Sequence, residues 1–258
     1  MPKIILKLDK NIEENASIYF EKSKKAKKKI EGANEALIKS KKKLKKIIKN
    51  NEKNIVSEKI IIKRKKEWFE KFHWFYSSEG FLVIGGRDAT TNEIIIKKYT
   101  DENDIVFHTD MAGSPFFVIK TDKKKPSDIT LKETGDATAS YSKGWRKNLA
   151  TQSVFYVKPK QVTKKAKAGE SLPKGAFMIY GKTTYIENKM KIAIGNKDNQ
   201  IIGGPIDAIK KQTNQFVEII QGENKASDIA KKIRKQFGFG DLDEIIRFLP
   251  SGGLEIKK

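Results

Sequence analysis

The residues best suited to chemistry lie in one stretch, residues 103–120, with the sequence NDIVFHTDMAGSPFFVIK. Two short apolar runs flank a Gly-Ser-Pro turn, a pattern typical of two buried strands joined by a connector. Asp104, His108 and Asp110 stand where the first strand gives way to the loop. Alternation with period two places these three side chains on one face for as long as the chain is extended. The stretch therefore predicts a functional edge.

A metal-dependent nuclease or other phosphoryl-transfer enzyme is one hypothesis for this edge. Asp88, Asp104, His108 and Asp110 would hold a divalent ion that activates water. Their spacing matches no metal-binding motif, and residues 93–97 do not fit a Glu-x-Lys nuclease signature. The chain has no cysteine and only two histidines, which argues against thiol catalysis and an ordinary zinc site. We expect a protein that is not an enzyme, with no catalytic residue, metal or cofactor.

A glycine pair precedes the first arginine of the central region. Gly85 and Gly86 are expected to allow positive φ and close backbone approach, and Arg87 supplies a planar fork suited to phosphate. The spacing differs from that of a P-loop or a dinucleotide-binding fingerprint. The turn therefore predicts phosphate contact without a nucleotide-binding fold.

The strongest compositional signal is charge. The chain has 54 Lys and Arg against 32 Asp and Glu, a formal net charge of +22. Residues 1–66 alone hold 22 basic and 8 acidic residues. A field of this sign attracts polyanions, and nucleic acid is the leading partner class. A lysine-biased composition or heat adaptation is the alternative explanation.

The basic N-terminal region, residues 1–66, is predicted to be a separate domain. Its pattern is helical from residue 12 to about 49, and Ile30, Leu37 and Leu44 recur at a spacing of seven, which suggests a coiled-coil seam. Asp9 and Asn11 are candidate helix caps, and a short strand is expected before them.

A turn at residues 50–54 and a second helix over 55–72 would complete an antiparallel hairpin. The aromatic residues within 68–76 have helical spacing and would fasten the hairpin to the rest of the chain, with base stacking as the alternative. The hairpin would pair with itself or with a second copy in a homodimer. A protein-interaction module that docks through this hairpin is a further alternative to nucleic-acid binding.

The remainder, residues 67–258, is predicted to be one α+β domain with a mixed, mostly antiparallel sheet and packed helices. We expect strands near residues 81–84, 93–98, 105–107, 116–119, 153–157, 177–180, 183–185, 190–194 and 215–221. Helices are expected from Ser127 to about 141, over 206–211, from Ser227 to 237 and over 241–249, with loops at 158–174 and 203–205. No run of 18 apolar residues and no signal peptide pattern occur, so we expect a cytoplasmic protein without membrane contact.

Several of these motifs carry a resemblance to a known family. They are GGRDA with Asn-Glu at 85–93, DIVFHTD with Gly-Ser-Pro at 104–115, ASYSK with Trp at 139–145, and VKP, QVTK and KGAFMIYGK between 157 and 182. Over about residues 66–184 the chain closely resembles the NFACT-R domain of the NFACT ribosome quality control family. The preceding basic hairpin resembles the coiled coil that comes before this domain in full-length members.

The resemblance implies an RNA-binding module of a ribosome-associated quality control factor. Its expected partners are the rRNA of an obstructed large ribosomal subunit, tRNA, and other domains of a full-length NFACT protein. The NFACT-N half of full-length members does not precede Lys3, which indicates a fragment or a truncated relative.

By motif match, the RNA-binding surface would include polar, aromatic and basic side chains. Arginine can fork onto phosphates, tryptophan can stack, and aspartate or histidine can bond ribose hydroxyls. The candidates in the globular part are Arg87, Asp88, His108, Asp110, Ser114, Lys143, Trp145, Arg146, Lys158, Lys164 and Lys165. Those in the hairpin are Lys41, Lys42 and Lys45.

Each polar candidate also has a structural interpretation. Asp88 would only cap a turn, Asp104 would brace Arg87, and His108 would be a core histidine whose hydrogen bonds are satisfied. The sequence leaves these interpretations open.

Overall fold

The computed structural model describes residues 4–55, 66–165 and 171–257. The chain divides into two units, Met1–Arg64 and Lys65–Lys258, and each is described by itself. None of the helices in the described part has the length and apolar content that crossing a bilayer requires.

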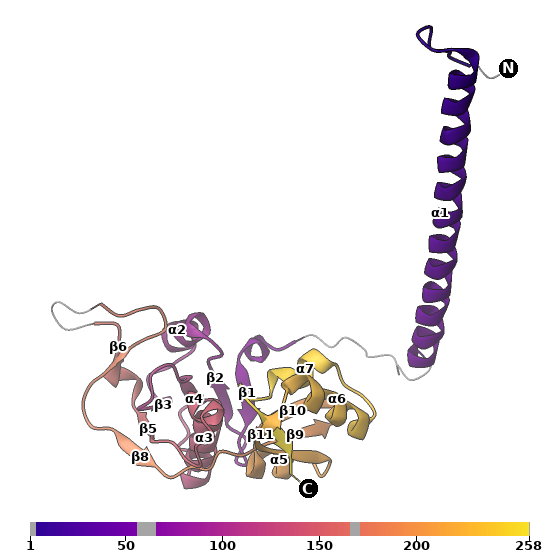
Figure 1. Ribbon diagram of the computed structural model, residues 1–258. Coiled ribbons are helices and arrows are strands. Elements are labelled where there is room, and N and C mark those ends of the chain that lie inside the picture. Colours follow the sequence, from indigo (N-terminus) through magenta and orange to yellow (C-terminus); the bar gives the residue numbers. More distant parts are fainter. Residues whose placement is uncertain (1–3, 56–65, 166–170, 258) are drawn as a thin grey trace. The chain divides into compact units, whose positions relative to one another are not determined.

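The first unit is built on one helix, α1 (Ile12–Ile55), drawn in indigo in Figure 1. Asn11 caps it as predicted: its Oδ1 accepts from the Glu14 N–H at 2.8 Å, and Glu14 Oε2 accepts from the Asn11 N–H at 3.1 Å. Residues 4–7 form no strand, contrary to the prediction. The buried Asn15 side chain holds them instead, because it bonds both the N–H and the C=O of Lys7.

The predicted turn at residues 50–54 is wrong, because α1 continues through it to Ile55. The segment contains no Gly or Pro. The low helix propensity of its asparagines costs less free energy than the loss of the helical hydrogen bonds that would follow if the helix ended here. Most of the predicted second arm, residues 56–65, lies outside the described residues. Ile30, Leu37 and Leu44 are exposed on α1, so pairing of this seam stays a prediction.

The second unit contains a six-stranded sheet in which every pair is antiparallel, in the order β1-β2-β4-β3-β5-β8. Its strands are β1 (His73–Tyr76), β2 (Leu82–Gly85), β3 (Ile105–Thr109), β4 (Phe117–Lys120), β5 (Val154–Val157) and β8 (Thr184–Ile186). The central strands bury apolar side chains completely, among them Val83, Val106 and Val118. The strands predicted at the central stretch are therefore confirmed.

A second sheet has the order β10-β9-β11-β12, and a short pair β6-β7 stands apart. These strands are β6 (Val162–Thr163), β7 (Met178–Ile179), β9 (Ile192–Lys197), β10 (Gln200–Pro205), β11 (Phe216–Asn224) and β12 (Leu254–Ile256). The helices of this unit are η1 (Trp68–Lys71), α2 (Ala89–Lys98), α3 (Asp128–Ser140), α4 (Lys143–Arg146), η2 (Pro159–Gln161), α5 (Ile206–Gln212), α6 (Ala226–Phe237) and α7 (Leu242–Arg247). Helix α3 contacts strands of both larger sheets. The α+β class with antiparallel sheets is confirmed.

Several local predictions in the second unit are wrong, among them the loop at 158–174, which contains η2 and β6. Residues 93–98 lie in helix α2, and the loop predicted at 203–205 belongs to strand β10. Glycine there leaves room for Phe75 and Phe248, whose side chains lie where a Cβ would be. Helix α6 begins at Ala226, before the predicted Ser227 cap. The aromatic run 68–76 forms a 3-10 turn and strand β1 instead of a helix.

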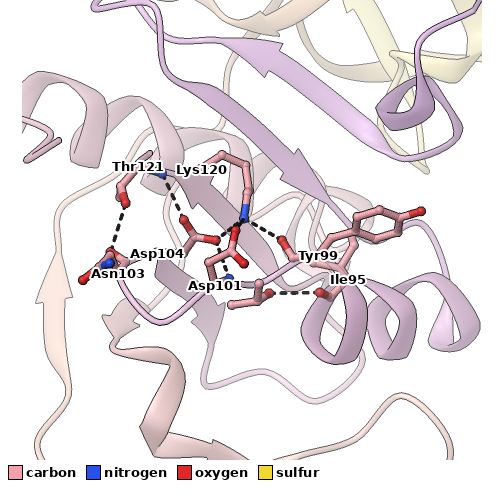
Figure 2. A network of polar contacts seen from close by, with 8 residues as sticks. Ile95, Tyr99, Asp101, Asn103, Asp104, Lys120 and Thr121 are labelled. Atoms are coloured by element: carbon pink, nitrogen blue, oxygen red, sulfur yellow. Dashed lines mark hydrogen bonds and ion pairs between the residues drawn. The ribbon is translucent and has the colours of Figure 1, made fainter. Parts of the chain in front are cut away.

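A buried polar network fixes the ends of α2, β3 and β4 relative to one another (Figure 2). Asp104 is buried, and its carboxylate accepts from Lys120 Nζ, from the Thr121 N–H at 3.0 Å and from the Asp101 N–H at 2.8 Å. Lys120 Nζ also donates to the Tyr99 carbonyl at 2.9 Å and to Asp101 at 2.6 Å. Burial alone would lower the pKa of Lys120, but its bonds to the two carboxylates outweigh burial and raise it.

Asp101 and Asp104 provide a matched pair of substitutions, because both bond Lys120 but only Asp104 is buried. Asp104→Ala removes the buried carboxylate that Lys120 and the N–H groups of Thr121 and Asp101 share, and should lower the free energy of unfolding by about 3 kcal/mol or more. Asp101→Ala, at an exposed carboxylate, should cost about 1 kcal/mol or less. Urea unfolding followed by tryptophan fluorescence reports on this unit alone, since all three tryptophans lie in it. Equal losses would contradict the assignment of Asp104 as the buried anchor.

Candidate nucleic-acid interface

A cleft of about 580 Å³ opens in the second unit and gathers segments that are far apart in the sequence. The first turn of α2, the loop after β3, the start of α4 and the segment before β7 all contribute to its wall. The polar and charged side chains that line it are His73, Arg87, Asp88, Asn92, His108, Ser114, Tyr141, Ser142, Lys143, Arg146, Lys174 and Ser251. Among the predicted candidates, the cleft thus brings together Arg87, Asp88, His108, Ser114, Lys143 and Arg146.

The start of α2 presents Arg87 to the cleft. Asp88 caps this helix: its Oδ1 accepts from the Thr91 N–H at 2.8 Å, and this bond lowers the pKa of the carboxyl. Thr91 Oγ1 accepts in turn from the Arg87 N–H at 2.8 Å. Burial, and then the charge of Arg247, lower the pKa of Arg87. Asp104 does not brace Arg87, contrary to that interpretation, because it is bonded to Lys120.

The glycine pair serves close packing and not positive φ. Neither Gly85 nor Gly86 has a left-handed backbone, which corrects that part of the prediction. A Cβ at Gly85 would meet the ring of Phe117, and one at Gly86 would meet the Asn92 side chain. Asn92 needs that place, because its Oδ1 accepts from the Phe116 N–H at 3.1 Å. Small residues here let α2 lie against the loop after β3.

The loop after β3 is organised by His108 and Ser114. The Nε2 atom of His108 lies 3.2 Å from the Ser114 carbonyl oxygen, and its ring stacks on Phe116 at 4.2 Å. Burial lowers the pKa of His108, so the ring is neutral at physiological pH. The hydroxyl of Ser114 is buried and bonded to Thr109 Oγ1 at 2.5 Å. Both side chains shape the loop, which supports the structural interpretation of His108.

Asp110 does not join this cluster. It does not line the cleft, and its carboxylate accepts from the Tyr185 hydroxyl at 3.2 Å. Asp104 and His108 lie at opposite ends of β3. Within the described ranges, no group of three or more His, Asp or Glu is placed to hold a metal ion. The constellation that the nuclease hypothesis requires is therefore not assembled in the described part of the chain.

Helix α4 supplies two further cations. Ser142 caps it by accepting from the Gly144 N–H at 3.0 Å, and Lys143 and Arg146 are exposed at the cleft. Trp145 points the other way: it is 1% exposed, and its Nε1 donates to the Gly253 carbonyl at 3.0 Å. The expectation that Trp145 stacks on a base is wrong, because its ring is enclosed in the core.

The basic segment after β5 contributes to the cleft through a residue that sequence reasoning missed. Lys158 and Lys165 are exposed but lie outside the cleft lining. Lys164 is engaged internally, with Nζ 3.3 Å from Glu93 Oε2 and 4.7 Å from the Phe177 ring centre. Lys174 is exposed and lines the cleft. In the sequence, only the glycine that follows Lys174 could have indicated this position. In the structure Gly175 has φ +79° and leaves no room for a Cβ beside Ala89.

Glu93 fastens this wall to α2. Its carboxylate accepts from Lys97 at 2.6 Å and from the Gly175 N–H at 3.1 Å, besides pairing with Lys164. The Lys97 bond, followed by the Gly175 bond, lowers the pKa of Glu93 to about 2. Lys174 is therefore held at the cleft by its neighbour in the chain.

The charges of the cleft are neutralised only in part, because Asp88 attracts Arg87 and Lys174 without forming an ion pair with either. Arg87, Lys143, Arg146 and Lys174 line it, and within the described residues their cationic groups form no ion pair or hydrogen bond. Asp88, the one carboxylate in the lining, already accepts from Thr91. Other lysines, such as Lys120, do have carboxylate partners. The arrangement suits an anionic ligand.

The fold and the cleft thus define an α+β domain with a concave basic site. Residues 71–181 match the family described as the NFACT protein RNA binding domain, and the chain belongs to the NFACT family, as its motifs indicate.

Curated relatives agree with this assignment. The archaeal Rqc2 homolog aRqcH of Methanocaldococcus jannaschii is 40% identical over 205 residues, 76% of this chain and 30% of that protein. The ribosome quality control complex subunit NEMF homolog of Drosophila melanogaster is 39% identical over 172 residues, 66% of this chain and 16% of that protein. Human NEMF is 45% identical over 124 residues, 48% of this chain and 11% of that protein. The chain thus spans less than a third of the length of these relatives.

Among solved structures, the C-terminal part of the fibronectin/fibrinogen-binding protein from Streptococcus suis is 19% identical with a TM-score of 0.40. The match covers 60% of this chain and 52% of the Streptococcus suis chain. A likeness at this level supports no argument.

The pKa of Glu93 predicts how pH acts on the cleft wall. Because the folded pKa is about 2 against an ordinary 4.5, the stability that the bonds of Glu93 to Lys97 and Gly175 contribute is fully present above pH 4.5 and is lost as pH falls through about 2. Glu93→Gln should shift and broaden the amide NMR signal of Gly175 at neutral pH, and Glu102→Gln, at an exposed carboxylate, should not. A Gly175 signal that is unchanged in Glu93→Gln would show that another contact holds this wall.

Proposed function

We propose that the chain is the RNA-binding module of a ribosome-associated quality control factor, and that the cleft is its phosphate-binding site. The observation that carries this proposal is a set of cations around one cleft that form no ion pair or hydrogen bond within the described residues: Arg87, Lys143, Arg146 and Lys174. RNA phosphates can neutralise these cations, and the binding of the phosphates releases counterions from the RNA. Arginine forks bind phosphate oxygens in pairs, which gives orientation as well as affinity.

Helix α1 supplies a second basic surface. Lys41, Lys42 and Lys45 are exposed on it, and no ion pair joins them to a carboxylate within the described residues. Repulsion among such dense like charges is relieved when a polyanion binds. We assign α1 to sequence-independent contact with an RNA backbone. Lys158 and Lys165 have the same role in the second unit.

The proposed partners follow from the family. The relatives are named as ribosome quality control subunits, and from this we infer that the chain engages rRNA and tRNA on an obstructed large ribosomal subunit in the cytoplasm. Other domains of a longer NFACT protein and a second copy bound through α1 are further partners in this proposal. Its role is binding and not catalysis.

Salt-dependent binding tests the proposal. Lys143→Ala/Arg146→Ala should weaken binding of single-stranded RNA about tenfold or more, and reduce the slope of log K against log salt by about 0.7 for each phosphate that the variant no longer neutralises. Lys211→Ala/Arg234→Ala removes two exposed cations from other helices of the same unit and is the matched control. Replacement of Lys41, Lys42, Lys43 and Lys45 by Ala measures the contribution of α1 in the same assay.

An unchanged affinity and slope in the cleft variant would overturn the proposed site. A flat salt dependence of the unmodified chain would favour the protein-interaction alternative, because phosphate contacts always release counterions.

A further inference from the structure

We propose that the cleft binds the phosphate-bearing end of a single RNA strand, in preference to the middle of a strand or a duplex. This inference rests on the proposed function, because it takes the cleft to be an RNA site. It specifies which chemical group of the RNA the cleft selects.

Size is the first argument. A cleft of about 580 Å³ lies in the range of sites that enclose one small molecule, and it has room for about one nucleotide. Double-stranded RNA is bound across its grooves on extended surfaces and does not enter such a cleft. The group that enters is therefore a single unpaired nucleotide.

Charge is the second argument. Four cations and the Asp88 carboxylate give the lining a net charge of +3. His73 and His108 add nothing, because burial lowers the pKa of both, that of His73 to about 3. A terminal phosphomonoester carries a charge of about −1.5 to −2, and the next diester adds about −1. The end of a strand, at about −2.5 to −3, thus matches the lining, whereas one internal nucleotide with its two flanking diesters brings about −2.

The third argument is which polar groups of the lining are already used. Asn92 bonds Phe116 and Ser114, Ser114 bonds Thr109, and Ser142 bonds Gly144. Recognition of a base requires unused donors and acceptors at its edges. The groups left free in the lining include the cations, which bind phosphate oxygens. Two other polar groups of the lining are also unused, since His73 Nδ1 is buried without a partner and Ser251 forms no hydrogen bond within the described residues. The cations outnumber them, so the cleft distinguishes ends by their phosphate.

The cations also converge from different segments, as a terminal phosphate requires. Arg87 precedes α2, Arg146 ends α4, and Lys174 lies in the segment before β7. Lys143 lies close to the loop after β3, since a Cβ on Gly113 would be 2.5 Å from its Nζ. A phosphomonoester presents three free oxygens to such donors, one more than a diester.

The test compares RNA oligonucleotides of one sequence that differ only in their ends. One has a 5′-phosphate, one a 3′-phosphate, one hydroxyls at both ends, and one is circular. The chain should bind one phosphorylated form roughly tenfold or more tightly than the hydroxyl form, because added charge-assisted hydrogen bonds have this effect. The preferred form identifies which end enters, and the circular form should bind no better than the hydroxyl form.

Arg146→Ala should abolish the preference for the phosphorylated end, and Arg234→Ala, at an exposed arginine on α6, should keep it. Lys174→Gln gives a second test at an exposed loop residue. Equal affinity for phosphorylated, hydroxyl and circular RNA, weakened equally by Arg146→Ala, would overturn the inference and leave the proposed function standing. A chain that binds none of the four forms would overturn both.

Discussion

The position of α2 depends on hydrogen bonds at both of its ends, and the cleft depends on the position of α2. At its C-terminal end, Lys120 joins the Tyr99 carbonyl to the buried Asp104, which ties the helix to β3 and β4. Near its N-terminal end, Asn92 bonds the loop after β3. These contacts hold both ends of α2, and Arg87 directly precedes the capping residue Asp88, so the guanidinium is presented beside a rigid element. Glu93, one residue after Asn92, holds the opposite wall.

The positive charge of the cleft persists because the carboxylate in its lining forms no ion pair with the cations. Elsewhere in this unit Lys120, Lys210 and Lys257 lie beside carboxylates, so the chain pairs lysines where its own acids allow. In the cleft the Asp88 carboxylate is committed to Thr91 as a helix cap. Holding like charges together costs free energy in the unbound protein, and a bound polyanion relieves it. We infer that relief of this repulsion adds to the affinity of the cleft for an anionic ligand.

Much of the fold was predictable, because the apolar runs of the sequence are the segments that the structure buries. The runs around Val106 and Val118 are apolar, short and bounded by turns, and they form the central strands. Helix α2 was not predictable in this way: its run of isoleucines is typical of a strand, and the Asp88 cap and its contacts with the loop after β3 decide the outcome. Trp145 and Lys174 show the same limit for the site. Residue type alone suggested that Trp145 stacks on an RNA base, but only the fold shows which side chains face the cleft.

The central claim is that RNA occupies the cleft, and photo-crosslinking tests it most directly. Single-stranded RNA with 4-thiouridine at each position in turn would be irradiated with the full chain, and the attachment points would be mapped by mass spectrometry. We expect crosslinks from the terminal position to concentrate in residues 112–116, 141–143, 146 and 173–177, which line the cleft. Crosslinks confined to α1, or to the surface of residues 182–258 away from the cleft, would contradict the claim.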